Sequence, residues 1–468
     1  MNCSYLTVLI LSNNTLHGQI LFSSIFNLRN LKILRLAQNN LTRVIPNALA
    51  NSSKLLIMDI GYNHISGQIP GWMGDLGLFK IIMPNNHIEG PIPKEFCSSG
   101  LSSVLGVLDL SMNNISGTLP SCLVLSNINH IHLSENRLRG PIPNSLCRNI
   151  FLETLDLSHN QLSGSVPSCL GNSSLLFLRY LVLKHNNLEG EIPNQLCQLK
   201  TLSLIDLSHN NLSSAIPLCL NVTAYEEAIV KIDYNSINPF GISFHTLPGW
   251  FATDESIELT TKNTSYSYKG RILVYLSGID LSSNKLTGKI PPEMGNFHTI
   301  IMMNLSHNSL SGAIPPSLSK LGKIESLDLS YNNLSGSIPR ELVELNFLAY
   351  FNVSYNNLSG KPPPRTAQFA TDFDENSYWG NPLLCGKPLP KNCSKSIEEP
   401  SSSNPTKDDQ EEDGGFMDIE SFFQTFGVSY TVVLLGIAAV LYINPYWRRA
   451  WFYFIQRLIT TCFYIFCH

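Results

Sequence analysis

The strongest constraint on this chain is a repeat of about 24 residues, whose clearest copies end in Gly-x-Ile-Pro or a close variant. Residues 105–120 read LGVLDLSMNNISGTLP, and residues 324–339 read IESLDLSYNNLSGSIP. A fixed period of this length indicates an architecture built from stacked structural repeats. Thirteen copies align, beginning at Leu6, Leu31, Leu55, Leu78, Leu105, Ile128, Leu152, Leu178, Leu202, Leu276, Ile300, Ile324 and Leu348.

The apolar spacing within a repeat favours a short strand over a helix. Leu105, Leu108 and Leu110 are three and two positions apart, whereas an amphipathic helix needs spacings of three and four. One coil cannot bury its own apolar face, so neighbouring coils must stack. We therefore expect an α/β-type leucine-rich-repeat solenoid, in which 13 repeats form a curved parallel β-sheet. An asparagine at the turn of every copy, from Asn14 to Asn356, should satisfy backbone groups inside the stack.

One step between repeats is 74 residues long and predicts an insertion over residues 218–275. Long irregular insertions in compact folds are usually functional or disordered, and the aromatic content of this one favours an ordered segment. The C-terminal part predicts a membrane anchor, because Phe422 to Ile443 holds no formal charge over 22 residues. Nine carboxylates and one lysine lie between Glu398 and Glu420, and arginines follow the apolar segment. The positive-inside rule then places the repeats outside the cell and the C-terminus in the cytoplasm.

Seven segments are expected from these boundaries, as a single-pass type I protein of the plasma membrane. They are leucine-rich repeats 1–9 without an N-terminal cap (1–217), an island insertion (218–275), repeats 10–13 (276–363), a C-terminal cap (364–396), an acidic juxtamembrane spacer (397–421), a single transmembrane α-helix (422–443) and a short cytoplasmic tail (444–468). The first repeat begins within five residues of Met1, with no signal peptide or polar cap before it. From this we expect a shortened gene model or a truncated copy.

Cysteines and glycosylation sequons indicate the secretory route. Six cysteines follow the repeat prolines at alternating offsets of four and two, and adjacent coils would bring them within disulfide distance. The predicted pairs are Cys97–Cys122, Cys147–Cys169 and Cys197–Cys219, and Cys385 and Cys393 can pair in the cap. Alternatively, the six cysteines of the inter-coil pairs are buried free thiols. Candidate glycosylated residues are Asn51, Asn114, Asn172, Asn211, Asn221, Asn263, Asn304, Asn333, Asn352, Asn357 and Asn392.

Taken together, the repeats, the insertion before the last four of them, NPLLCGKPL, the acidic spacer, the single span and the NPYWRRAWFYFI tail resemble plant leucine-rich-repeat receptor-like proteins. These cell-surface receptors lack a kinase. The resemblance implies perception of an extracellular peptide, protein or glycan ligand in immunity or development. It also implies partner leucine-rich-repeat receptor kinases, one an adaptor and one a co-receptor. In the island motifs of the family, Lys262, Tyr268, Lys269 and Gly270 match, whereas Thr260 replaces an expected tyrosine.

The residues just before the turn asparagines are the ones we expect to carry recognition, because a concave strand face can vary without harming the core. Candidate ligand contacts there are Tyr62, Met112, Glu135, His159, His185 and His209, and candidate co-receptor contacts are Ser283, His307, Tyr331 and Tyr355. The three successive histidines could alternatively form a metal site or an acid sensor. The simpler explanation is that histidine is a common residue at this position of the repeat.

No catalytic motif stands outside the repeat scheme, so neither an enzyme nor a cofactor is expected. The net charge of −4 does not indicate a nucleic-acid binder. Asp109, Asp156, Asp206, Asp280 and Asp328 share one repeat position and should form a surface column. Two alternatives to a receptor stay open at this point. One is a truncated, non-functional decoy, and the other is a wall-associated repeat protein that inhibits microbial enzymes.

Overall fold

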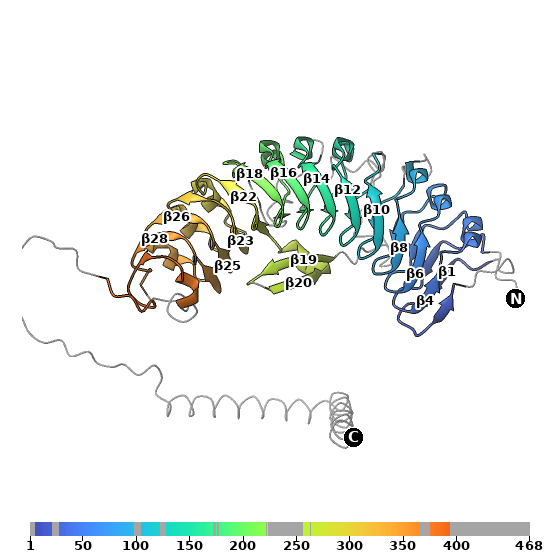
Figure 1. Ribbon diagram of the computed structural model, residues 1–468. Helices are drawn as coiled ribbons and strands as arrows, with labels where there is room; N and C mark the ends of the chain where they lie inside the picture. Colours follow the sequence, from blue (N-terminus) through green and yellow to red (C-terminus); the bar gives the residue numbers. More distant parts are fainter. Residues whose placement is uncertain are drawn as a thin grey trace, which may run out of the picture. The chain divides into compact units, whose positions relative to one another are not determined.

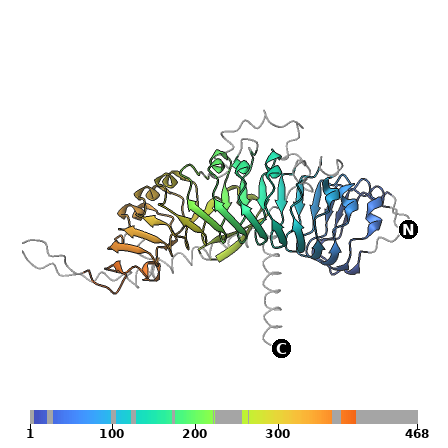
Figure 2. The ribbon, with the colours of Figure 1, turned by 45° about the horizontal axis from the view of Figure 1, so that its top comes forward.

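The protein is described here by a computed structural model. Its described residues are 5–20, 28–97, 104–121, 128–171, 175, 177–220, 222, 256–262, 264–364 and 375–393. All of them belong to one compact unit, Met1–Ser394. Within that unit the strands follow a curved row, which Figure 1 shows from the side and Figure 2 from a tilted direction.

A parallel sheet of 13 strands, one from each repeat, lines the concave side of this row (Figure 1). Each strand has three residues, and partners pair in register, as Val107 does with His130. The predicted solenoid with a parallel sheet is therefore confirmed. The strands are β1 (Val8–Ile10), β3 (Ile33–Arg35), β5 (Ile57–Asp59), β7 (Lys80–Ile82), β9 (Val107–Asp109), β11 (His130–His132), β13 (Thr154–Asp156), β15 (Tyr180–Val182), β17 (Leu204–Asp206), β21 (Gly278–Asp280), β23 (Met302–Asn304), β25 (Ser326–Asp328) and β27 (Tyr350–Asn352).

A second set of strands follows the turns, which the single-sheet expectation missed. Ten pair as β2 (His17–Gln19), β4 (Asn40–Arg43), β6 (His64–Gln68), β8 (His87–Gly90), β10 (Asn114–Thr118), β12 (Arg137–Gly140), β14 (Gln161–Ser165), β16 (Asn187–Glu191), β18 (Asn211–Ala215) and β22 (Lys285–Thr287). Four more pair as β24 (Ser311–Gly312), β26 (Asn333–Gly336), β28 (Asn357–Gly360) and β29 (Leu383–Leu384).

The backs of the coils correct the α/β-type label, because their helices are 3₁₀ and the described residues include no α-helix. Proline precedes most of these helices and fixes an extended approach, as at Pro143 with φ −72°. They are η1 (Asn47–Asn51), η2 (Gly71–Gly74), η3 (Lys94–Cys97), η4 (Asn144–Arg148), η5 (Ser168–Gly171), η6 (Asn194–Gln198), η10 (Gly270–Val274), η11 (Pro292–Asn296), η12 (Pro316–Lys320), η13 (Arg340–Glu344) and η15 (Glu375–Tyr378).

A continuous apolar core runs through the stack, and the turn asparagines join its coils. Leu105, Leu108 and Leu110 are all buried, as their spacing predicts. Asn160 accepts a hydrogen bond from the backbone N–H of Leu138 at 2.9 Å and donates to the carbonyl of Leu133 at 2.9 Å. Because both partners lie in the preceding coil, each asparagine satisfies buried backbone groups of its neighbour.

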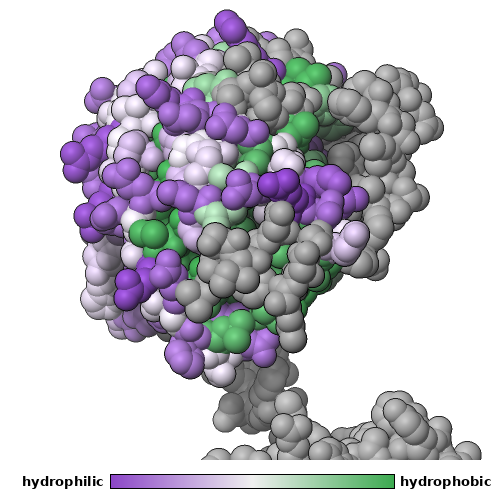
Figure 3. All heavy atoms as spheres, turned by 90° about the vertical axis from the view of Figure 1, so that its right-hand side faces the viewer, coloured by the Kyte–Doolittle hydropathy of each residue, from purple (hydrophilic) through white to green (hydrophobic). Residues whose placement is uncertain are grey.

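The C-terminal cap continues the same pattern. Asn381 accepts from the N–H of Leu358 at 3.0 Å and donates to the carbonyl of Val353 at 2.9 Å, as a turn asparagine of one more coil would. A disulfide joins Cys385 to Cys393 in the cap. At the opposite end of the stack, Ile10, Leu11 and Leu16 are exposed, and Figure 3 shows apolar side chains among polar ones on that end.

Two of the predicted inter-coil disulfides, Cys147–Cys169 and Cys197–Cys219, join neighbouring coils with Cα separations of 5.6 and 5.3 Å. Cys97 is also disulfide-bonded, and its predicted partner Cys122 lies outside the described residues. Within the described part of the chain, no helix has the length and apolarity needed to cross a bilayer. The predicted span from Phe422 to Ile443 lies outside that part.

We expect replacement of Asn160 by leucine to lower the free energy of unfolding by about 2–4 kcal/mol, because it leaves a buried N–H and several carbonyls without partners. Urea unfolding followed by circular dichroism measures this. The control is Gln161→Leu, since the neighbouring Gln161 is exposed. Equal stability of the two variants would contradict the structural role of the asparagine.

Candidate functional site

The candidate recognition residues form one column along the rim of the concave sheet, although not on the strands where the sequence placed them. Each three-residue strand ends before this column, and the column residues adopt a left-handed conformation, with φ of 53° at Tyr62 and 54° at Tyr355. Their backbone N–H groups still reach the next coil, as from His185 to the carbonyl of Ser208 at 3.0 Å. The side chains therefore lie side by side on successive coils. We call this column, which runs from residue 13 to residue 355, the rim.

Rings on the rim stack face to face. The ring centroids of His159 and His185 are 4.2 Å apart, and those of His185 and His209 are 4.0 Å apart. A second stack joins His307 to Tyr331 at 4.2 Å and Tyr331 to Tyr355 at 4.3 Å. Stacked aromatic pairs of this kind stabilise each other beyond their burial.

The central histidine of the first stack has a lowered pKa. Burial between its neighbours, together with the nearby His209, lowers the pKa of His185 to about 4. Burial also lowers the pKa of His209. His185 is therefore neutral from mildly acidic to neutral pH. The described residues also contain no cluster of three side chains able to hold a metal ion.

The island insertion places an antiparallel hairpin on the concave sheet, made of β19 (Ser256–Thr261) and β20 (Thr264–Lys269) (Figure 1). Ile257 and Leu259 of the hairpin are fully buried in a second apolar cluster. Their partners in it include Tyr180 and Leu204 of the sheet, and Tyr268 packs against the cluster's edge. The hairpin thus covers side chains of the concave sheet, such as Tyr180 and Leu204, that would otherwise face solvent.

Polar contacts join the island insertion to two separate repeats of the concave sheet. At repeat 8, the ammonium group of Lys184 lies 3.0 Å from the carboxylate of Glu258, and the Tyr180 hydroxyl donates to the carbonyl of Leu273 at 2.6 Å. At repeat 12, Lys262 pairs with Glu325 at 3.1 Å. The Lys184 side chain is almost wholly buried, so solvent screens its ion pair with Glu258 less than the exposed pair of Lys262 and Glu325.

Two carboxylates of the expected surface column, those of Asp206 and Asp280, are buried instead of exposed. Asp206 and Asp280 are 1% and 2% exposed. Burial raises the pKa of Asp280 to about 7, with Asp206 adding to the effect, and burial also raises the pKa of Asp206. Each accepts a short hydrogen bond from a serine two residues later, Ser208 or Ser282.

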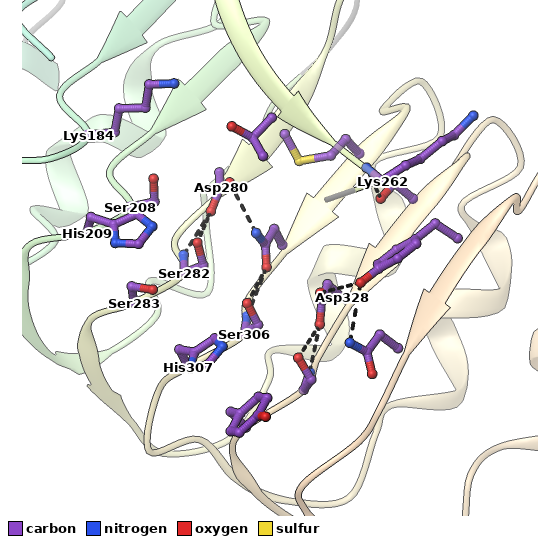
Figure 4. Close-up of a pocket in the computed structure, with 18 of the residues that line it drawn as sticks. Lys184, Ser208, His209, Lys262, Asp280, Ser282, Ser283, Ser306, His307 and Asp328 are labelled. Carbon is purple, nitrogen blue, oxygen red and sulfur yellow. Dashed lines mark hydrogen bonds between the residues drawn. The ribbon is translucent and has the colours of Figure 1, made fainter. Parts of the chain in front are cut away.

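A cavity of about 350 Å³ lies between the hairpin and the concave face of the C-terminal repeats. Figure 4 shows Lys184 and Lys262 in the upper part of the view, the rim residues His209, Ser283 and His307 in a row at the lower left, and Asp280 and Asp328 between them. Hydroxyl, amide and imidazole groups dominate its lining, so it suits a ligand that hydrogen-bonds. Its lining residues are Lys184, His185, Ser208, His209, Thr260, Lys262, Asp280, Ser282, Ser283, Met302, Asn304, Ser306, His307, Ser326, Asp328, Ser330, Tyr331, Tyr350 and Asn352.

The structure brings some predicted site residues together and separates others. His185, His209, Ser283, His307, Tyr331 and Lys262 all line the cavity. Tyr62, Met112 and Glu135 lie on earlier coils, and no lining residue comes from those coils. Of the remaining island candidates, Tyr268 and Lys269 end β20, and Gly270 opens η10 with φ 67°.

Sequence reasoning missed Tyr180, Lys184 and Glu258. A signal for the first two was present, since repeat 8 reads YLVLK where repeat 9 reads LIDLS. Lysine there replaces the serine that usually bonds the aspartate two residues before it, as Ser208 bonds Asp206.

The candidate glycosylation sites fall into three groups. Asn304 and Asn352 lie on concave strands with their amides hydrogen-bonded, which disfavours them as acceptors. Asn172, Asn221 and Asn263 lie outside the described residues. Sites on turn strands, 3₁₀ segments or the cap are at least partly accessible: Asn51, Asn114, Asn211, Asn333, Asn357 and Asn392.

Models of the leucine rich repeat match residues 29–88, and also 105–124, 127–149, 151–173, 177–199, 275–297, 299–321 and 323–345. These parts of the chain are therefore leucine-rich repeats.

Relatives from plants confirm the resemblance to receptor-like proteins. Cuscuta receptor 1 of Solanum lycopersicum is 61% identical over 211 residues, which cover 45% of this chain and 19% of that protein. Receptor-like protein 13 of Arabidopsis thaliana is 45% identical over 236 residues, or 50% of this chain and 20% of that protein. Receptor-like protein 1 of the same plant is 55% identical over 206 residues, covering 43% and 19%. The chain thus matches about a fifth of the length of these relatives.

Solved plant receptors share the fold. The crystal structure of PEPR1–AtPEP1 is 26% identical in sequence, with a TM-score of 0.59, and the match covers 81% of this chain and 53% of that one. A TDR receptor is 25% identical, with a TM-score of 0.60, and covers 82% and 59%.

We expect Leu259→Ala to weaken docking of the hairpin by about 2–4 kcal/mol, because it removes a fully buried side chain from the second apolar cluster. Hydrogen exchange of residues 256–269 should accelerate, while exchange in β5 should not change. Tyr266→Ala is the control, since Tyr266 is 51% exposed. Unaltered exchange in the hairpin would show that this cluster does not hold it.

The raised pKa of Asp280 predicts a pH-dependent stability. Its contribution is present below the ordinary pKa of 3.8 and is lost as pH rises toward about 7, because the folded state resists ionisation of the buried group. The urea midpoint of Asp280→Asn should therefore not fall as pH rises from 3.8 to about 7.

His185→Gln should change the dependence of the urea midpoint on pH in the opposite sense. The stability linked to the lowered pKa of His185 is lost as pH falls from 6.5 toward about 4. Parallel profiles for all three proteins would contradict these assignments.

Proposed function

We propose that this chain is a plant cell-surface receptor-like protein that binds an extracellular ligand and signals through partner receptor kinases. The observation that carries the proposal is the polar cavity of about 350 Å³ that the island hairpin and the concave sheet border. Ligand pockets tend to form where separate elements meet, and the many hydrogen-bonding groups in this lining suit a polar ligand. PEPR1–AtPEP1, whose fold the chain shares, supports a peptide or protein ligand.

In this proposal the ligand occupies the cavity beside His185 and His209, and the rest of the rim extends the contact toward Tyr62, Met112, Glu135 and His159. Lys262 and the end of β20, at Tyr268, Lys269 and Gly270, border the site from the island side. A partner kinase ectodomain would then contact the last coils at Tyr331 and Tyr355, next to ligand held at Ser283 and His307. Both tyrosines are more than 40% exposed, which supports their availability to a partner.

The proposed anchor is the apolar segment from Phe422 to Ile443, with the repeats outside the plasma membrane and the acidic spacer between them. Signalling would then pass to the partners, an adaptor and a co-receptor kinase. The names of the relatives support a receptor.

The proposal predicts that Ser283→Glu combined with His307→Glu abolishes ligand-dependent recovery of a partner receptor kinase, because two carboxylates enter the cavity rim. The full-length tagged chain, expressed in leaf cells, would be precipitated after treatment with Cuscuta and microbial extracts, and partners identified by mass spectrometry. Phe347→Glu serves as the control, since Phe347 is 64% exposed and does not line the cavity.

Unchanged recovery from the double variant would contradict the placing of the site. Recovery of the wild-type chain in the soluble cytosolic fraction would contradict the receptor proposal as a whole.

A further inference from the structure

The two ring stacks of the rim are separated by one coil that carries no ring. His209 ends the first stack and His307 begins the second, while Ser283 holds the rim position between them. The three coils are consecutive, because β17 pairs with β21 and β21 with β23 in unbroken register. Of the rim positions, only this one has a small side chain with a ring on each side.

The space left by Ser283 has the dimensions of one ring. Neighbouring strands are about 4.8 Å apart, so two steps separate the backbones of His209 and His307 by roughly 9–10 Å. Within each stack, rings follow one another at 4.0–4.3 Å. A planar group inserted over Ser283 would therefore contact a ring on each face at ordinary stacking distance.

The backbone holds this gap open. Ser283 has the same left-handed conformation as its neighbours, with φ 52° against 52° for His209 and 53° for His307. Its N–H donates to the carbonyl of Ser306 at 2.9 Å, and that of His209 donates to the carbonyl of Ser282 at 2.9 Å. Since the hydrogen bonds between coils are intact on both sides, the stack does not close over the missing ring. All three residues line the cavity, and Figure 4 shows Ser283 between the two imidazoles.

We propose that the gap over Ser283, bounded by the rings of His209 and His307, binds one planar aromatic side chain of the extracellular ligand. This inference rests on the proposed receptor function and adds the chemistry of one ligand residue to it. A neutral aromatic ring matches the imidazole on each side of the gap, whereas the lining as a whole, with Lys184 and Lys262 as well as Asp280 and Asp328, gives no excess of negative charge to attract a guanidinium group. Burial also keeps the His209 imidazole uncharged by lowering its pKa, which favours stacking between neutral rings.

The test uses N-acetyl-5-fluorotryptophanamide as the probe and fluorine NMR of the probe with the purified full-length chain. We expect the wild-type chain to broaden and shift the probe signal. Ser283→His should weaken probe binding by roughly tenfold or more, because the new imidazole supplies the missing ring itself and removes two stacking faces. Histidine is compatible with this backbone, since it occupies the rim at residues 159, 185, 209 and 307.

Asn85→His is the matched control. It adds an imidazole at the same rim conformation, φ 50°, on a coil outside the cavity, and probe binding should be unchanged. N-acetylleucinamide, which is apolar but not planar, should fail to displace the probe. Urea midpoints of both variants establish that they are folded.

Three results would overturn the inference: no response of the wild-type chain at millimolar probe, equal probe binding by Ser283→His, or displacement of the probe by methylguanidinium more readily than by indole. The last result would assign the gap to an arginine side chain. If kinase recovery in leaf cells still depends on the extracts, the receptor function stands and only the aromatic contact is wrong. If that recovery also fails, the receptor proposal is wrong too.

Discussion

The stack depends on the hydrogen bonds that each turn asparagine makes to the coil before it. An apolar core alone would let flat coils slide over one another, because burial has no direction. The side chain of Asn186 accepts from the N–H of Leu162 and donates to the carbonyl of Leu157, which sets the position of one coil on the next. Since the bonds are buried, losing one leaves polar groups unpaired rather than returned to water. The concave sheet and the rim inherit their regular spacing from this contact.

Most of the architecture could be predicted from the sequence, because it repeats a local pattern. The period predicted one strand per coil, and the apolar positions predicted the core, as at Leu108 and Leu110. The turn geometry was not predictable in the same way. A left-handed residue such as Glu135 or Met112 carries no side-chain signal of its conformation, since neither is glycine or asparagine. The 3₁₀ backs of the coils also have no distinctive pattern beyond the preceding proline.

The docking of the island was beyond prediction, because it depends on contacts between segments far apart in the chain. Glu258 pairs with a lysine 74 positions earlier, and nothing local to the hairpin indicates that partner. Asp206 and Asp280, which were expected on the surface, are buried in the same region of the concave sheet. Repeat 8 did carry a sign of this docking, because Tyr180 and Lys184 stand where repeat 9 has leucine and serine. Departures from a repeat consensus on the concave face are thus informative about what covers it.

The near-identity of the coil backbones has an evolutionary consequence. Rim residues as different as Tyr62, Glu135 and Ser283 share one conformation within a few degrees of φ, so the scaffold is indifferent to which side chain stands there. Unequal crossing-over between gene copies can therefore add, remove or exchange a 24-residue unit and still yield a foldable chain. Such an event would alter which rings become neighbours, and binding preferences could diverge faster than the framework that carries them.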